Sequence, residues 1–402
     1  MTRPRQHQPY NSNYRWVMLL LLWLLYACFG IISRAIFPLV TPILNDLRIT
    51  YSQMGFILGS WQLTYIVMAL VAGSILDRWG VRKSLFAGAI IICLSSSLRY
   101  FSSDFATLLI AVALFGVGGP MISIGGPKTI SSWFSGPGRG IAIGLYTSGN
   151  WLGGLLALAL TNSLVMPLAG NHWKQVFVFY GLITFASGLL WIFSAREKER
   201  AQTSETMAVI DVFRNLGKLR NVRIVLAMGL LSFAISHGVS SWLPKILEIN
   251  GMSARQAGFA ASIAIAAGIP SILILPSVVP ARCRGIAMAI LAVLTAVNII
   301  LVMKTSGMSL YIGLAVLGFI SAPFMALLLL ILMDSPEVEP GHMGSAAGMF
   351  YCVAEIGGFA GPFFMGLLVD LTGTFMAGAL FLAGLCIAIA VLTRFLRRGT
   401  PD

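Results

Sequence analysis

Twelve long apolar segments follow one another along the chain, and no other feature constrains its fold as strongly. A helix of about 20 apolar residues crosses the hydrocarbon core of a bilayer, and each segment reaches or approaches that length. The expected spans are 16–44, 53–76, 84–102, 105–127, 139–163, 174–195, 223–247, 255–278, 284–303, 309–333, 342–368 and 375–396. We therefore expect an all-α membrane protein with twelve transmembrane helices.

The composition fits a chain whose solvent is lipid. Hydrophobic residues make up 57% of the 402 residues and charged residues only 10%, against about 25% charged in soluble domains. The chain has 42 glycines, as expected where helices pack closely in a membrane. Its five cysteines are scattered through apolar segments without metal or disulfide spacing, so we expect them to be small packing residues and expect no metal site.

The distribution of Lys and Arg predicts the orientation. With both termini inside, the cytoplasmic segments hold twenty of these residues and the outer side holds six. The outer six are Arg48, Arg99, Lys174, Lys245, Arg255 and Lys304. Under the positive-inside rule the termini are therefore cytoplasmic. The net charge of +13 is then a topology signal, and we expect no nucleic-acid partner.

The two halves of the sequence repeat. A shift of 203 residues places Gln53, Gly55 and Phe56 on Gln256, Gly258 and Phe259, and Arg34 on His237. A shift of 204 places Gly140, Gly144, Gly153 and Gly154 on Gly344, Gly348, Gly357 and Gly358. Between the halves, the basic stretch 196–222 has short amphipathic spacing, which predicts a linker with a surface helix on the cytoplasmic face.

The loop at residues 73–83 is the most specific motif. Gly73 allows two helices to approach closely, and Gly80 allows a turn where a side chain would clash. Its bases, Arg78, Arg82 and Lys83, hold the loop in the cytoplasm. Asp77 is an anion able to cap a neighbouring helix or to pair with those bases. A positive-inside anchor alone explains the bases but neither Asp77 nor the glycine spacing.

This pattern, G-x-x-x-D-R-x-G-x-R-K, resembles at every defined position the loop between helices 2 and 3 of the major facilitator superfamily. The resemblance implies a secondary transporter whose two six-helix bundles, related by a pseudo-twofold axis, alternate access to a central cavity. The expected domains are a cytoplasmic tail at 1–15, an N-terminal bundle at 16–195, the linker at 196–222, a C-terminal bundle at 223–396 and a tail at 397–402.

A second stretch narrows the branch of the family. Residues 127–154 look like the helix 4–5 junction of the anion-transporting branches, which include the nitrate/cyanate-like, organophosphate and anion:cation symporter groups. The acid that usually precedes the arginine is absent, since Gly138 stands before Arg139.

Ionisable residues inside spans are costly, so each is a functional candidate. Arg34 lies on one face of the first span with Tyr26, Gly30 and Pro38, and a guanidinium grips a carboxylate, sulfonate or phosphate with two hydrogen bonds. The alternatives are a structural ion pair or snorkelling to the outer surface. His237, at the repeat-equivalent position, is either an anion or proton site or a neutral histidine bonded to a nearby serine.

Glu355 is the only carboxylate in a membrane interior. It is a candidate proton site, a candidate counter-ion to Arg34 or His237 that substrate releases, or a structural residue. Lys128 is a weaker candidate, as a second anion contact in the inner vestibule or a snorkelling base. Tyr146 and Asn150 are candidate cavity residues, although periodicity does not separate cavity from packing positions.

These residues favour uptake of a small organic anion, a carboxylate or related oxyanion, by proton symport across a bacterial inner membrane. We expect a monomer whose partners are the anion, protons and the lipid bilayer. The sequence has no nucleotide-binding loop and no nucleophile–base constellation, so we expect neither a cofactor nor an enzyme.

Two rival functions stay open. One is an exporter of a drug or metabolite, which Arg34 and the dipeptide Gly149-Asn150 disfavour because drug antiporters carry Gly-Pro there. The other is a membrane sensor that does not transport, for which the linker offers no signalling segment.

The loop at 73–83 is also expected to act as a cytoplasmic gate. Asp77 would cap the N-terminus of the eleventh helix, and Asp334, Glu337 and Glu339 would pair with the loop's bases. Its second-half counterpart, 276–286, is degraded, so the gate is expected to depend mainly on this one loop.

Overall fold

The computed structural model describes residues 13–197, 215–335, 338 and 343–396. Within them, twelve helical segments are long and apolar enough to cross a membrane, and each coincides with one of the expected spans apart from a few residues at the ends. The predicted all-α architecture is thereby confirmed. The surface helix expected in the linker falls largely outside the described residues.

The first half contributes α1 (Tyr14–Arg34), η1 (Phe37–Leu39), α2 (Val40–Leu47), α3 (Tyr51–Trp79), α4 (Val81–Leu98), α5 (Phe105–Trp133), α6 (Pro137–Leu160), α7 (Met166–Leu168) and α8 (Trp173–Ser194). The second half contributes α10 (Arg220–Ile249), α11 (Ala254–Val278), α12 (Arg284–Lys304), α13 (Gly307–Ser321), α14 (Phe324–Met333), α15 (Met343–Thr372) and α16 (Phe375–Leu392). The first span combines α1, η1 and α2, and the tenth combines α13 and α14.

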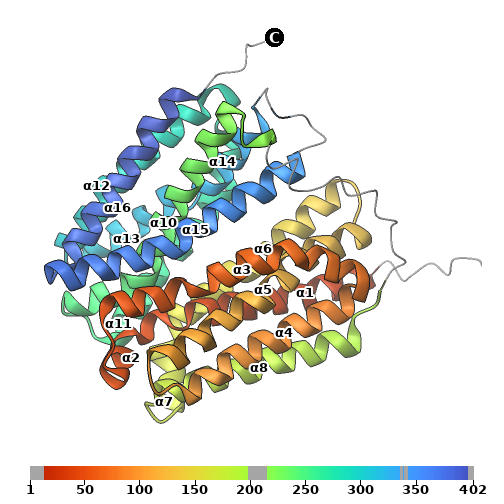
Figure 1. The fold of residues 1–402 in the computed structure, drawn as a ribbon, viewed down its shortest axis with the longest axis horizontal. Coiled ribbons are helices and arrows are strands. Elements are labelled where there is room, and N and C mark those ends of the chain that lie inside the picture. Colours follow the sequence, from red (N-terminus) through yellow and green to blue (C-terminus); the bar gives the residue numbers. More distant parts are fainter. Residues whose placement is uncertain (1–12, 198–214, 336–337, 339–342, 397–402) are drawn as a thin grey trace, which may run out of the picture.

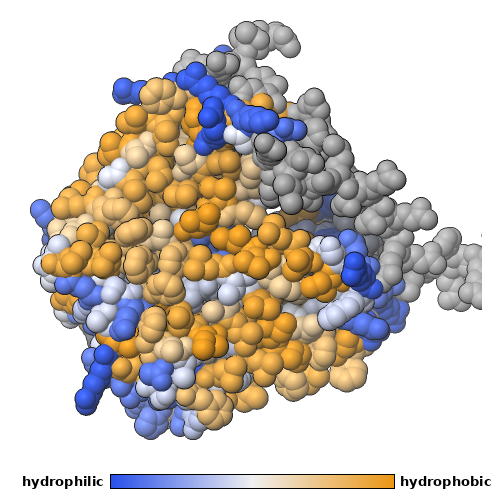
Figure 2. Space-filling model, viewed as in Figure 1, coloured by the Kyte–Doolittle hydropathy of each residue, from blue (hydrophilic) through white to orange (hydrophobic). Residues whose placement is uncertain are grey.

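The helices form two bundles, one from each half of the chain (Figure 1). Across the boundary between them, α3 packs along α15 and α6 packs along α11. We call the end that carries residues 73–83 and both described chain ends the linker end, and the opposite end, which carries the α2–α3 loop, the distal end. In Figure 2, hydrophobic surface separates hydrophilic residues at the two ends, as a bilayer-spanning protein requires.

The space around individual glycines shows where the two bundles are in close contact. In the distal half of α3, a Cβ added at Gly55 would overlap the backbone of Pro362, and one at Gly59 would overlap that of Phe359. In the linker-end halves of α3, α6 and α15, a Cβ at Gly73, Gly144 or Gly348 would meet nothing within 4 Å. Small residues therefore bring the backbones together at the distal end, while the bundles stand apart at the linker end.

Candidate functional site

Arg34 stands where the first span breaks. Pro38 has no backbone N–H to continue an α-helix, and α1 ends at Arg34 before the short 3₁₀ turn η1. A cation in the last turn also complements the negative end of the helix dipole. Gly154 on α6 leaves room for the side chain, since a Cβ there would lie 2.8 Å from Nε of Arg34.

The guanidinium of Arg34 has neutral partners. Its Nη1 donates to Oδ1 of Asn150 at 2.8 Å and approaches the Asn150 carbonyl at 3.5 Å. Its carbon lies 6.0 Å from the ring centroid of Trp151. Among the described residues the ion pairs are Lys128–Asp77, Lys174–Asp46 and Arg284–Asp334, and none includes Arg34. No carboxylate in the described part of the chain therefore pairs with this cation.

A pocket opens beside Arg34 between the two bundles. Arg34, Phe37 and Trp151 line it from the first half, and α10 to α14 line it from the second. Three of its four serines, Ser232, Ser236 and Ser240, follow one another at four-residue spacing on one face of α10. The buried Ser232 hydroxyl has no hydrogen-bond partner among the described residues. The pocket thus combines a fixed cation with hydroxyl groups.

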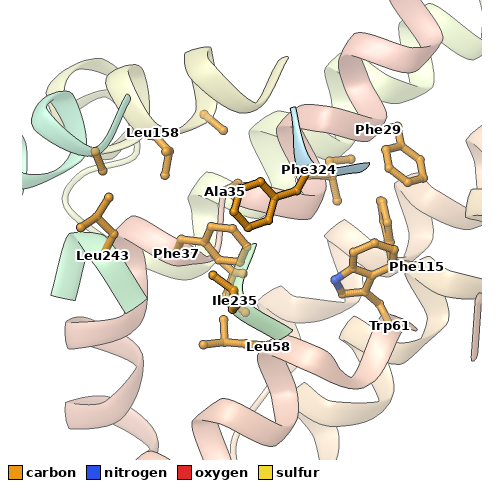
Figure 3. Packing of buried hydrophobic residues seen from close by; sticks show 14 of the residues in the cluster. Phe29, Ala35, Phe37, Leu58, Trp61, Phe115, Leu158, Ile235, Leu243 and Phe324 are labelled. Carbon is orange, nitrogen blue, oxygen red and sulfur yellow. The ribbon is translucent and has the colours of Figure 1, made fainter. Parts of the chain in front are cut away.

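Apolar side chains cover this pocket toward the distal end. Figure 3 shows Phe37, Leu158 and Leu243 gathered from three different segments, and all three line the pocket. Leu158 also meets α11, because its carbonyl lies against Gly258. The arrangement keeps a polar ligand at Arg34 away from the distal surface.

His237 lies at the boundary between the bundles and does not line this pocket. Its Nδ1 is 3.1 Å from the amide nitrogen of Gln62 on α3, which also reaches the Gly358 carbonyl on α15 at 3.4 Å. Gln62 is thus a cross-bundle contact that the sequence analysis missed. The repeat pairs Gln53 with Gln256 and does not include Gln62. A glutamine in a span is also uncharged, so the search for ionisable residues does not find it.

Glu355 is buried on α15, with 9% of its surface exposed. Its Oε2 has no hydrogen-bond partner among the described residues, and the same holds for Oε1 of Gln62. A Cβ placed at Gly358 would lie 3.2 Å from the carboxylate and 3.3 Å from Cγ of Gln62, so the two side chains flank this glycine. An unpaired carboxylate in such a place costs much less energy when it carries a proton.

Two other candidate residues, Lys128 and Tyr146, do not line the Arg34 pocket. Lys128 pairs with Asp77 at the linker end. Tyr146 stacks on Tyr26 with ring centroids 4.4 Å apart and donates from its hydroxyl to the Ile122 carbonyl at 2.8 Å. Both therefore serve packing or pairing inside the first bundle, whereas Asn150 contacts Arg34 as described.

The loop at 73–83 is bound within its own bundle. Gly80 adopts a φ of +81°, so the turn needs a glycine there. Arg82 donates from Nε to the Ile192 carbonyl at 2.9 Å, and Glu197 accepts from the Val81 N–H at 2.9 Å. Lys83 is exposed. Of the acids expected to meet this loop, Asp334 pairs with Arg284 instead, while Glu337 and Glu339 lie outside the described residues.

The distal end carries cross-bundle polar contacts that the sequence analysis did not anticipate. The carboxylate of Asp370, near the end of α15, accepts the first backbone N–H groups of α3, from Tyr51 at 3.0 Å and Ser52 at 2.7 Å. Thr41 bonds to Glu248 and accepts from Nζ of Lys245 at 2.9 Å. An anion at a helix N-terminus is the arrangement predicted for Asp77 at the opposite end.

The described residues hold no group of three or more His, Cys, Asp or Glu side chains that could bind a metal ion. The site offers a guanidinium at Arg34 and a buried carboxyl at Glu355, groups of the kinds that bind anions and protons.

Comparison with known proteins gives the family. The model of the Major Facilitator Superfamily matches residues 22–362. The chain is similar to the hexuronate transporter of Bacillus subtilis, with 25% identity covering 91% of each chain. It is also similar to the probable galactarate/D-glucarate transporter GudP of Bacillus subtilis, with 22% identity covering 97% of this chain and 93% of the relative.

A solved structure supports the fold independently. A bacterial homologue of the human lysosomal transporter Spinster, in an inward-facing and unoccupied conformation, superposes with a TM-score of 0.75. The likeness covers 97% of this chain and 99% of that chain at 18% identity, so it supports the fold alone.

Proposed function

The chain belongs to the Major Facilitator Superfamily, and we propose that it imports a small sugar acid by proton-coupled alternating access. Membership makes the protein an integral membrane transporter rather than an enzyme, as the sequence resemblance predicted. The observation that carries the proposal is the guanidinium of Arg34, which lies in a pocket between the two bundles and forms no ion pair with a described residue.

The pocket suits the two parts of a sugar acid. The carboxylate would take two hydrogen bonds from Arg34, whose forked geometry matches it. The sugar hydroxyls would bond to serines such as Ser232, and the indole of Trp151 would cover a C–H face of the ring. Two relatives are named as transporters of sugar acids, one of hexuronate and one, as a probable assignment, of galactarate or D-glucarate.

Glu355 is the candidate proton carrier. Its buried carboxyl has an unpartnered oxygen, which disfavours the alternative of a permanent counter-ion to Arg34. Its neighbour Gln62, on α3, contacts His237 on α10 across the boundary between the bundles. A change in the charge of Glu355 would therefore alter the electrostatic environment of this cross-bundle contact. Protonation from one side and release to the other would then couple the proton to alternating access.

Two gates would alternate during transport. With the termini cytoplasmic, the open linker end makes this an inward-facing state. The contacts of Asp370 and Glu248 keep the distal end of that state closed. In the outward-facing state Asp77 would leave Lys128 and cap α15 at the linker end, as expected from the sequence.

The test of the proposed function is uptake by proteoliposomes with the interior alkaline by one pH unit. Labelled galacturonate should accumulate, whereas galactose, which lacks the carboxylate, should not. Accumulation should collapse when a protonophore is added. Uptake that ignores the pH gradient would reject the proton coupling. Extrusion of a lipophilic cation with no galacturonate flux would favour the exporter instead.

The two gates give a paired prediction. Asp370→Asn should raise the outward-facing population about tenfold or more, because asparagine keeps one acceptor oxygen and loses the other, and one hydrogen bond to a charged acceptor contributes roughly 1.5–3 kcal/mol. Asp77→Asn should shift the population the other way and slow turnover more than it weakens binding. Spin labels at Ser103 and Asn250, exposed at the distal end of different bundles, report the separation by pulsed electron resonance. Shifts in the same direction for both variants would contradict the two-gate scheme.

A further inference from the structure

The transport mechanism leaves a large groove unused on the outside of the second bundle. Its volume is ≈ 1270 Å³, and its walls come from α12, the end of α14 and α16. In Figure 1, α12 and α16 lie on the side of the second bundle that is away from the first. The groove shares no residue with the Arg34 pocket.

The walls of the groove are apolar and open to the surroundings. Ile286, Ile290 and Leu294 of α12 and Ile387 and Val391 of α16 are all exposed. These helices span the membrane, so the exposed walls meet lipid. From Ile286 to Leu294 a helix advances about 12 Å, close to the ~15 Å depth of one leaflet.

The mouth of the groove is basic. Arg282, Arg284 and Arg394 line it at the linker end. Asp334 pairs with Arg284, so that charge is compensated. Arg282 and Arg394 are exposed and have no ion pair among the described residues. Two uncompensated guanidinium groups therefore stand where the apolar groove reaches the membrane surface.

We propose that this groove binds an anionic glycerophospholipid from the linker-end leaflet. Its phosphate lies between Arg282 and Arg394, and one acyl chain follows the apolar walls. Guanidinium groups bind phosphate oxygens in pairs, and basic pockets between membrane helices on the cytoplasmic side accept anionic headgroups. A zwitterionic lipid fills the same walls but offers the arginines no net charge.

Native mass spectrometry of the full chain tests the proposal, with phosphatidylglycerol and phosphatidylethanolamine of identical acyl chains added in turn. The double substitution Arg282→Gln and Arg394→Gln should weaken phosphatidylglycerol binding about 30-fold, from two surface charges, and leave phosphatidylethanolamine binding unchanged. Lys218→Gln removes an exposed base at the same end that does not line the groove, and it should change neither.

A second variant tests the groove itself. Ala289 lines it, and Ala289→Phe should fill it and reduce retention of both lipids while the helical content stays unchanged. Undiminished phosphatidylglycerol binding by the double-arginine variant would overturn the proposal. Displacement of the lipid by millimolar inorganic phosphate, or a second copy of the chain in its place, would overturn it too.

Discussion

Arg34→Ala is expected to lower the affinity for a sugar acid by about 30-fold or more and so to abolish uptake at micromolar concentrations. Removing one partner of a buried, hydrogen-bonded charge pair costs 2–5 kcal/mol or more. Arg34→Lys retains the charge but loses the forked donor geometry, so it should recover only part of the affinity. Binding is measured by isothermal titration and uptake in proteoliposomes.

The control for this variant is Arg255→Ala, which removes an exposed base at the distal end outside the pocket. It should leave affinity and uptake unchanged. Unaltered anion affinity in Arg34→Ala, with the protein still folded by circular dichroism, would remove Arg34 from the binding site. A loss confined to turnover would make it a gating residue instead.

Much of the architecture follows from short-range features of the sequence. Apolar length alone located the twelve spans, because lipid sets the length of a crossing helix. The four-residue spacing of Tyr26, Gly30, Arg34 and Pro38 singled out Arg34, a costly charge that signals function. The break of the helix after Arg34 was not predicted. The motif at 73–83 and the family match lead to the same superfamily.

The sequence does not predict which residues each side chain contacts. Arg99 was counted on the outer side of the membrane, but the structure buries it to 1% exposure, 4.9 Å from the ring of Phe177. Its Nη1 reaches the Ile32 carbonyl at 3.4 Å, beside the break in the first span. Charge and hydropathy along the chain do not say which neighbouring helix receives a residue near a span end.

The state of the transporter was also out of reach. Asp77 meets Lys128 in this arrangement, and we propose that its predicted contact with α15 forms in the opposite one. The same sequence adopts both the inward-facing and the outward-facing arrangement, so a sequence motif predicts a gate but not whether that gate is open or closed. The role of Asp370 was not predicted, because the sequence around it gives no sign that the N-terminus of α3 lies beside it in space.

Glu355→Gln carries the second large effect, because it separates transport from its coupling to protons. For one proton per anion, a gradient of one pH unit supports about tenfold accumulation. The glutamine variant should lose this accumulation and equilibrate the labelled anion to a ratio of about one. Exchange of internal for external anion should continue, since Arg34 and the pocket serines are intact.

The control is Asp104→Asn, an exposed acid whose pKa is lowered by the backbone N–H of Thr107 at the start of α5. Asparagine caps a helix about as well as aspartate, so this variant should accumulate the anion like the wild type. If Glu355→Gln still concentrates the anion, the proton travels by another route and the buried carboxyl is structural. If both exchange and accumulation disappear, Glu355 is needed for binding, and the counter-ion alternative gains support.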